Sequence, residues 1–426
     1  MSVLRRLIDK QHEILHRPGS KLNKLWPAFD AFETFLLNPD HRTKRTGPHV
    51  RDYADLKRVM WTVIVALVPC LLCSIWNTGA QHFLAIAEMA AKKGAGFEYH
   101  AGWLQGWLGS EDLAQAASQP GFVAPAWDKI VFGLQQLLPL IVVSYVVGLG
   151  IEMLFSVIRN EEVSEGYLVS GLLIPLIVPP SLPLWQLAVG VAFAVVLGKE
   201  VFGGTGMNIF NPALLCRAFL FFAFPAQISG DSVWVAGNDK GGLVDGFTQA
   251  TPLAVVKPEA VADASTQLAQ HYSAMDLFLG NIPGSAGEVS KLMVLLGAFW
   301  LVFTGVGSWR VMLGGVLGLL GTATVMHFAL PSHGGTMSLM PWEQLLCGGF
   351  LFGIVFMATD PVSSPETNTG KWIYGLLIGF VTILVRTINQ AYPEGTMLAI
   401  LLLNAFAPGI DHFVVTANIR QRMARQ

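Results

Sequence analysis

The sequence predicts an all-α membrane protein with about ten transmembrane helices. Of its 426 residues, 53% are apolar and only 13% are charged, whereas soluble domains carry about 25% charged residues. The apolar residues also gather into runs that approach the roughly 20 residues needed to cross a bilayer. The predicted spans are residues 59–77, 130–157, 167–180, 183–198, 208–227, 291–307, 309–330, 344–358, 372–388 and 395–410.

The spans divide the chain into five parts. These are a basic N-terminal segment (1–58), five spans (59–227), a polar loop (228–290), five further spans (291–410) and a short tail (411–426). The N-terminal segment holds 12 Lys and Arg against 7 Asp and Glu, and no run in it is apolar enough to insert, so the first span is the expected anchor. Cytoplasmic segments are enriched in Lys and Arg, which places both termini in the cytoplasm and the acidic loop outside.

The two sets of five spans resemble each other. Residues 198–219 ("GKEVFGGTGMNIFNPALLCRAF") and 385–406 ("VRTINQAYPEGTMLAILLLNAF") both place a polar, glycine-containing break between apolar segments and end in Ala-Phe. The matching spans lie five apart, and this odd offset turns the second copy upside down. The pattern therefore predicts two inverted five-helix repeats with broken helices, the plan of many transporters and channels.

The first break, "GGTGMNIFNPALL", combines features of a tight turn and a helix start. Asn211 and Pro212 suit the N-cap and first position of a helix. Asn208 lies three residues earlier and is expected to point the same way. The two amides either only cap the helix and satisfy the broken backbone, or hydrogen-bond a polar planar ligand held between spans.

A second short pattern lies in the polar loop. Residues 243–256 read "LVDGFTQATPLAVV", with Thr248 and Thr251 three residues apart behind Asp245 and Gly246. Outside a recognised motif, a loop threonine is ordinarily a turn residue. A hydroxyl in a polar loop is nevertheless accessible to a modifying enzyme.

Ionisable residues within spans are costly and commonly functional. Glu152 lies one to two turns from the cytoplasmic end of its span, and Asp411 lies near the end of the last one. Both either form ion pairs or help to admit a cation. Cys70 and Cys73 form a C-x-x-C in the first span, where small core residues are the ordinary interpretation. A metal or cluster would need two more ligands, so no metal site is predicted from this chain alone.

Three stretches together resemble a known family. "GKEVFGGTGMNIFNPALLCRAFLFFAFP", "DGFTQATPL" and "MATDPVSSPETNTGKWIYG" are similar to the B subunits of the sodium-translocating NADH:quinone oxidoreductases and to the homologous D subunits of Rnf complexes. The resemblance runs from about residue 40 to the end. The basic segment containing "GPHVRDYADLKR" favours the quinone reductases.

The resemblance implies that the phosphate of FMN is esterified to Thr251 by a flavin transferase outside the membrane. Asp245 would help to seat that enzyme, while Gly246 and Ala250 leave it room to grip the peptide. Thr248 is the rival acceptor. The family usually has glycine before the alanine, where this chain has Gln249.

The family also holds a second flavin, riboflavin, without a covalent bond. Asn208 and Asn211 resemble its contact asparagines, and Asp360 in "ATDP" resembles their partner acid. Both breaks face the cytoplasm in the predicted topology, so these residues are expected to meet.

The quinone region and the ion pathway are implied in the same way. Gly148 and Gly150 resemble the glycines of the ubiquinone region, although the family has adjacent glycines and this chain has Leu149 between them. Helix packing is the alternative for both. Glu152 and Asp411 resemble acids that help to admit the cation.

The implied function is that of a flavin-carrying subunit in a multi-subunit, ion-pumping NADH:ubiquinone reductase of the bacterial inner membrane. Electrons would come from a flavin and iron–sulfur subunit that oxidises NADH, because "GGTGMN" follows an apolar span and does not fit a dinucleotide fingerprint. No catalytic residue is predicted, and nucleic acid is not among the expected partners. Sodium is the usual coupling ion, with protons as the alternative. An Rnf-type subunit and a non-redox channel or carrier are the other interpretations.

Overall fold

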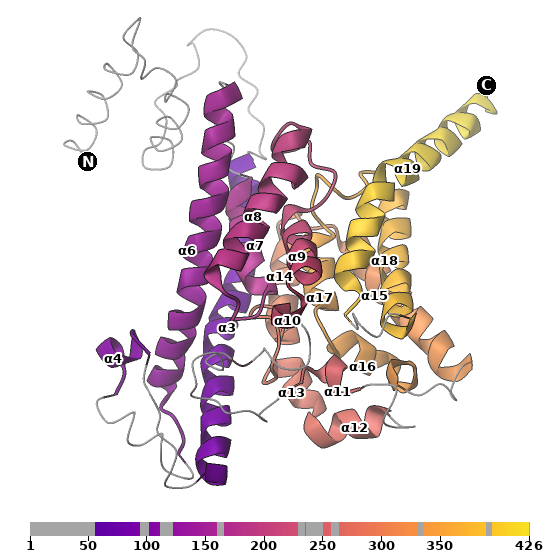
Figure 1. Ribbon diagram of the computed structural model, residues 1–426. Coiled ribbons are helices and arrows are strands. Elements are labelled where there is room, and N and C mark those ends of the chain that lie inside the picture. Colours follow the sequence, from indigo (N-terminus) through magenta and orange to yellow (C-terminus); the bar gives the residue numbers. More distant parts are fainter. Residues whose placement is uncertain are drawn as a thin grey trace, which may run out of the picture.

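The computed structural model describes residues 56–93, 102–110, 122–159, 166–228, 235, 250–256, 264–329, 335–388 and 394–425, and every element in these ranges is a helix. Six of the helical segments are long and apolar enough to cross a membrane (Figure 1). They are built from α3 (Leu56–Lys93), α6 (Ala126–Arg159), α8 (Leu184–Gly198) with the following 3₁₀ turn η3 (Glu200–Phe202), α15 (Trp309–Ala329), α18 (Asn368–Ile388) and α19 (Thr396–Met423).

Four shorter helical segments lie among the long ones. They are α7 (Tyr167–Ile177), α9 (Pro212–Ala223), α14 (Lys291–Phe303), and α17 (Phe350–Phe352) continued by the π-helix η7 (Gly353–Met357). At 1.5 Å per residue, the 12 residues of α9 rise about 18 Å, which is well short of the roughly 30 Å hydrocarbon core. Each of the ten predicted spans thus contains a helix, and four are half-helices that need neighbouring protein to satisfy their ends.

Several helix boundaries differ from the predicted ones. Helix α3 continues well past residue 77, where its polar side chains are buried against protein; the Asn77 amide, for example, donates to the carbonyl of Ile282 at 3.0 Å. Helix α9 begins only at Pro212, because the preceding residues form the break. Helix α19 runs without interruption to Met423, so the predicted tail continues the last span.

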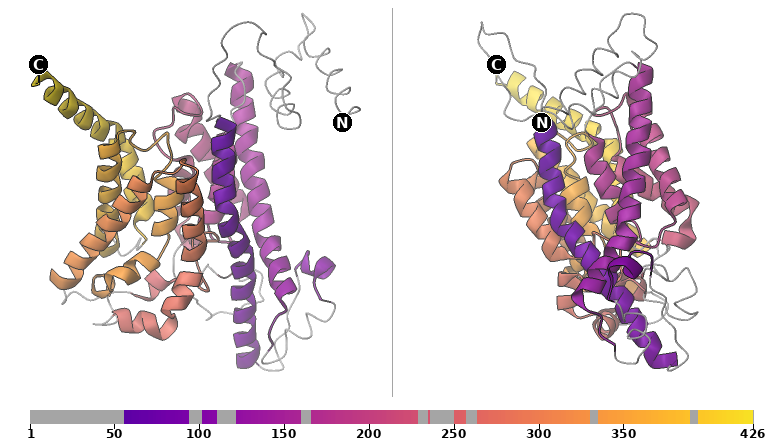
Figure 2. Two further views of the ribbon diagram at one scale, coloured as in Figure 1. Left: turned by 180° about the vertical axis from the view of Figure 1, so that it is seen from behind. Right: turned by 90° about the vertical axis from the view of Figure 1, so that its left-hand side faces the viewer.

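The two ends of the molecule have different characters. The tail end is where α6 finishes at Arg159 and α19 finishes at Met423. The cap end carries the short helices α11 (Pro252–Val255), α12 (Ala264–His271), α13 (Ala274–Leu279), η6 (Gly335–Ser338) and α16 (Pro341–Leu346). Figure 2 shows the same separation from two further sides. Two small helices complete the described elements, α4 (Gln105–Leu108) beside α6 and α10 (Pro225–Ile228) after α9.

The predicted inverted repeat is confirmed by the packing. Helix α8 contacts α6 and α9 in the first repeat, as α18 contacts α15 and α19 in the second, and α7 contacts α9 as η7 contacts α19. Helix α8 ends beside Arg159 at the tail end, whereas α18 ends beside α16 at the cap end. The equivalent helices therefore run in opposite directions.

A reciprocal contact joins the repeats. Arg217 of α9 forms an ion pair with Glu394, just before α19. Asn404 of α19 lies against the start of α9, where its amide oxygen, in the orientation that satisfies both amide atoms, accepts from the Asn211 N–H at 3.3 Å. Positions 217 and 404 match in the repeat, so each repeat uses the same position to hold the break of the other.

Close helix packing depends on glycine. A Cβ atom on Gly379 of α18 would lie 2.3 Å from the carbonyl oxygen of Gly315 on α15, and one on Gly318 would lie 2.2 Å from the carbonyl oxygen of Leu376. Neither position has room for a larger residue. The backbones of α15 and α18 therefore approach each other directly, as is common where small residues line membrane helices.

Candidate functional site

The first break lies at the tail end and is built from glycines in the left-handed region. Gly203, Gly204 and Gly206 have φ angles of +120°, +93° and +89°, a conformation that side chains disfavour. The chain then enters α9, where the Asn211 carboxamide oxygen accepts from the N–H groups of Ala213 at 3.0 Å and Leu214 at 3.3 Å. Asn211 is therefore the N-cap that the sequence predicts.

Asn211 also meets the acid with which it was expected to act. Its Nδ2 donates to Asp360 Oδ2 at 3.4 Å, and Asp360 accepts further hydrogen bonds from the Val362 N–H at 3.2 Å and the Ser363 hydroxyl at 3.0 Å. Burial raises the pKa of the Asp360 carboxyl, and these three donors oppose the shift. The structure thus brings together residues 149 positions apart in the sequence.

These two residues line a cavity between α3, α7, α14 and the break. It spans about 610 Å³ when the solvent at its open mouth is counted. Most of its walls are apolar, and a few polar groups point into it. Its lining includes Val59, Met60, Val63, Val169, Ser170, Leu173, Asn211, Leu301, Phe356, Thr359 and Asp360.

Asn208 does not line this cavity. Its amide donates to the carbonyl of Phe210 at 3.0 Å. The expectation that Asn208 and Asn211 point the same way relied on helical spacing, but the helix starts only after both residues. The side chain of Asn208 therefore stabilises the break itself.

Two ion pairs tie the break to the end of α6. Glu152 pairs with Lys199, and both side chains are almost fully buried. Arg159 pairs with Glu200 at 2.8 Å and also donates to its backbone carbonyl. Pairing, one of the two expectations for Glu152, is what the structure shows. These contacts fix the position of the break relative to α6.

The predicted quinone glycines occupy different surroundings. A Cβ atom on Gly148 would lie 1.9 Å from the ring of Tyr167, so glycine is needed there for packing of α6 against α7. A Cβ atom on Gly150 would meet nothing within 4 Å. Only Gly148 is therefore restricted by its neighbours.

Asp411 caps a neighbouring helix. Its carboxylate accepts from the N–H groups of Glu366 at 2.7 Å and Thr367 at 3.1 Å, directly before α18 begins. Helix starts leave such N–H groups without intrahelical partners. This contact holds α19 to α18 at the tail end.

Thr251 lies at the cap end, on the opposite side of the molecule from the cavity. It is the N-cap of α11, with φ −62° and ψ 156°, but its side chain makes no capping hydrogen bond to that helix. The residue is partly exposed, as is Ala250 before it. The other predicted members of this motif, Asp245, Gly246 and Thr248, lie outside the described residues.

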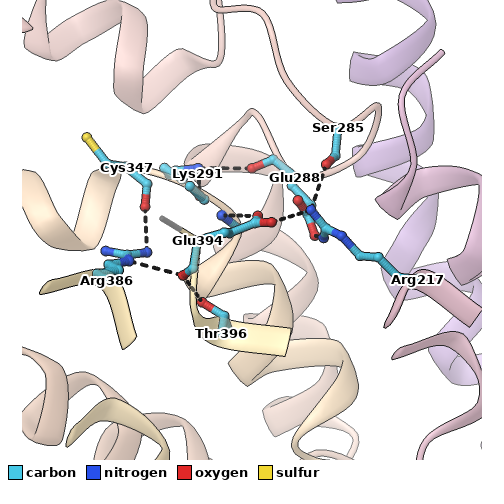
Figure 3. A network of polar contacts seen from close by, with 10 residues as sticks. Arg217, Ser285, Glu288, Lys291, Cys347, Arg386, Glu394 and Thr396 are labelled. Atoms are coloured by element: carbon cyan, nitrogen blue, oxygen red, sulfur yellow. Dashed lines mark hydrogen bonds and ion pairs between the residues drawn. The ribbon is translucent and has the colours of Figure 1, made fainter. Parts of the chain in front are cut away.

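A buried charge network beneath the cap was not predicted as a unit (Figure 3). Arg217 Nη1 donates to Glu288 Oε1 at 2.5 Å, and its Nη2 pairs with Glu394. Lys291 Nζ donates to the carbonyls of Glu288 at 2.9 Å and Gly348 at 2.7 Å. The network therefore joins α9, α14 and the segments before α17 and α19.

Arg386 completes the network from the end of α18. Its guanidinium donates to the carbonyls of Gln344 at 2.6 Å, Cys347 at 3.0 Å and Glu394 at 3.1 Å. The repeat contains the signal that would have indicated this role, because Arg386 occupies the position that matches Lys199. Each repeat places a buried cation at the end of its fourth helix.

Comparison with known proteins identifies one family over nearly the whole chain. The model of the NQR2, RnfD, RnfE family matches residues 43–420. The chain belongs to this family. Its relatives include proteins named as the B subunit of Na(+)-translocating NADH-quinone reductase. The one from Chromohalobacter salexigens is 46% identical over 99% of this chain and 96% of its own length. Those from Ectopseudomonas mendocina and Klebsiella pneumoniae are each 44% identical over 99% of both chains.

The residues present fit the two flavins that the family resemblance implies. Thr251 is a partly exposed residue whose hydroxyl makes no capping hydrogen bond to α11, which leaves it compatible with a phosphoester. The cavity offers apolar walls for a flat ring system, with Asn211 and Asp360 as a carboxamide and a carboxyl to meet its polar edge.

Proposed function

We propose that this chain is the flavin-bearing membrane subunit of a sodium-translocating NADH:ubiquinone reductase. The identity of 43–46% over almost the whole chain to proteins of that name supports the proposal. All of the relatives reported above carry the quinone-reductase name, which favours this assignment over an Rnf-type subunit or a solute channel.

One observation carries the covalent-flavin assignment: Thr251 is the N-cap residue of α11, but its hydroxyl makes no capping hydrogen bond. A phosphoester forms when Oγ1 of Thr251 attacks the flavin-side phosphorus of an activated donor, a flavin dinucleotide. The P–O–P anhydride bond breaks, the nucleoside monophosphate leaves with the electron pair, and a base of the transferase takes the hydroxyl proton. Thr251 stands directly before α11, at a partly exposed position of the cap.

Asn211 and Asp360 are the proposed contacts of riboflavin at the tail end, supported by their direct hydrogen bond and by the cavity they line. Asn208 is the proposed indirect contributor, because its amide holds the break from which Asn211 enters the cavity. The bound flavins would supply one- and two-electron chemistry, while the chain holds them and excludes water.

The remaining proposed assignments concern the quinone region and the ion pathway. Gly148 and Gly150 on α6 are the proposed quinone region, and Glu152 and Asp411 are the proposed acids of the ion pathway. Sodium is the proposed coupling ion. The partners are a flavin and iron–sulfur subunit that oxidises NADH, the other membrane subunits and the flavin transferase, in the bacterial inner membrane with both termini cytoplasmic.

The experiment that tests the proposal is mass analysis of the purified, denatured chain beside Thr251→Ala. Trypsin should release residues 241–291 as one peptide, because the Lys257–Pro258 bond resists cleavage. We expect one FMN on this peptide in the wild type and none in Thr251→Ala. An unmodified peptide from cells that contain the transferase would refute the assignment, and FMN retained in Thr251→Ala would move it to Thr248.

A further inference from the structure

The proposed acceptor threonine stands at the edge of a small folded unit at the cap end. Apolar side chains from α11, α12, α13 and the segments around α16 form a separate buried cluster. Its members are Leu253, Val256, Ala264, Leu268, Leu277, Ile282, Val289, Leu339 and Cys347, with Tyr272 and Leu346 packed against it. Thr251 therefore lies two residues before a side chain of this cluster.

Tyr272 holds the backbone directly before the acceptor. Its hydroxyl donates to the carbonyl of Ala250 at 2.8 Å, while its ring packs against the cluster. Burial raises the pKa of this phenol to about 12, so it stays a donor at any physiological pH. A side chain that comes 22 residues later in the sequence thus fixes the peptide plane that joins Ala250 to Thr251.

The other side of the acceptor is fixed too. The Thr251 carbonyl accepts from the N–H groups of Ala254 at 2.8 Å and Val255 at 3.0 Å, which close the turn of α11. Leu253 packs on Gly348: a Cβ atom added to Gly348 would lie 2.7 Å from Cδ1 of Leu253. The peptide groups on both sides of Thr251 are therefore held by the folded cap.

We propose that Tyr272 is a positioning residue for flavin attachment: it holds the Ala250 carbonyl so that the Thr251 hydroxyl is presented to the transferase in one conformation. The inference rests on the proposed function of Thr251. It also means that the transferase recognises the folded cap, and that attachment follows folding of the loop instead of acting on an extended chain.

The chemical step is unchanged by this inference. The Thr251 oxygen gains the flavin phosphate, the dinucleotide loses its nucleoside monophosphate, and the transferase takes the proton. Tyr272 contributes by raising the fraction of chains in the reactive conformation. The apparent affinity of the transferase for its protein substrate falls in proportion when that fraction falls.

Tyr272→Phe tests the inference, because it keeps the ring and removes only the donor. The assay follows the rate of flavin transfer from flavin dinucleotide to full-length, flavin-free chain in detergent, read by flavin fluorescence and by the mass of the 241–291 peptide. We expect the KM for the chain to rise about five- to tenfold, the scale of one lost neutral hydrogen bond, with kcat and final occupancy unchanged.

Tyr145→Phe is the matched control. Tyr145 lies on α6, away from the cap. Its hydroxyl also donates to a backbone carbonyl, that of Leu168 on α7, at 2.7 Å. The Tyr145→Phe chain should accept flavin with the KM of the wild type. A wild-type KM for Tyr272→Phe overturns the inference, and so does a fall in final occupancy with an unchanged KM, which indicates unfolding alone.

A second comparison does not depend on how the variant folds. Wild-type chain that has been unfolded with urea in detergent should accept flavin at a lower rate than native chain does. Equal transfer rates for the two forms overturn the inference. A native wild-type chain that accepts no flavin refutes the proposed function itself, which is a separate result.

Discussion

Replacing Arg217 with methionine removes the cation that two buried carboxylates share. Arg217 and Glu288 are 4% and 7% exposed, and Glu394 is 17% exposed. Methionine fills much of the same space without charge, so the change isolates the electrostatic contribution. Glu288 and Glu394 then face each other without a guanidinium between them and keep only uncharged donors, such as the Gly349 N–H to Glu394 Oε1 at 3.1 Å.

The expected cost is large because the group is buried. Removing one partner of a buried ion pair destabilises a protein by about 3–5 kcal/mol. At about 2 °C for each kcal/mol in a large domain, the midpoint of thermal unfolding should fall by roughly 6 to 10 °C. Arg422→Met, which removes an exposed cation near the end of α19, should change it by less than about 1 °C.

The deficit should also depend on pH. Burial raises the pKa of the Glu288 carboxyl, and the Arg217 guanidinium opposes that shift. Without Arg217, burial and the Glu394 carboxylate still raise this pKa and only the hydrogen bond to Ser285 opposes them. The folded variant therefore binds the Glu288 proton more tightly than the unfolded chain and more tightly than the folded wild type. Its stability is then greatest at low pH and falls as pH rises toward the folded pKa. In the wild type the pKa of Glu288 is already raised to about 8, so both folded proteins hold this proton below that pH and only the variant holds it above. The gap from wild type should therefore be wider at about pH 9.5 than at about pH 7.

Thermal unfolding in detergent, followed by tryptophan fluorescence, measures these effects. Adding Glu394→Gln to Arg217→Met should cost less than Glu394→Gln alone, with a coupling of about 0.5–3 kcal/mol. Arg217→Met that unfolds with the wild type at both pH values would refute the reasoning. Strict additivity in the double variant would show that the ion pair contributes nothing.

Three further substitutions test the tail end. Gly148→Ala should destabilise the chain by about 1–3 kcal/mol by overpacking, while Gly150→Ala should leave its thermal midpoint unchanged, because only the first Cβ atom meets a neighbour; equal effects would contradict this packing. Asn211→Ala should lower stability by about 1–2 kcal/mol through loss of the helix cap. It should also lower the bound riboflavin measured after extraction, since the cavity loses its carboxamide and Asp360 loses one of its three donors. Full riboflavin content in a folded Asn211→Ala protein would remove this residue from the proposed flavin site.

The positions of the helices were predictable because membrane spans form long apolar runs in the sequence. All ten predicted segments contain helix. The contact of Asn211 with Asp360 was expected from the family resemblance, and the predicted topology placed both residues on the same side. Helix ends were less predictable. Asn77 is polar and ends the apolar run, yet α3 continues past it because the Ile282 carbonyl, 205 residues away, accepts its hydrogen bond.

The charge network could not be predicted because its members come from distant parts of the chain. Glu288 lies 71 residues from Arg217, and Glu394 lies 177 residues from it. No spacing rule connects them, since the break before α19 places Glu394 and the turn before α14 places Glu288. The orientation of Asn208 was misjudged for a related reason: periodicity applies only after a helix has begun.

Helix α9 is a short rod that is held at its start and at its middle by the same part of the protein, the second repeat. Asn211 at its start is fastened to Asp360 and Asn404, and Arg217, about 9 Å farther along, is fastened to Glu394. All three fastenings belong to the second repeat. A displacement of the rod at the tail-end cavity would therefore be transmitted to the charges beneath the cap without any unfolding between them.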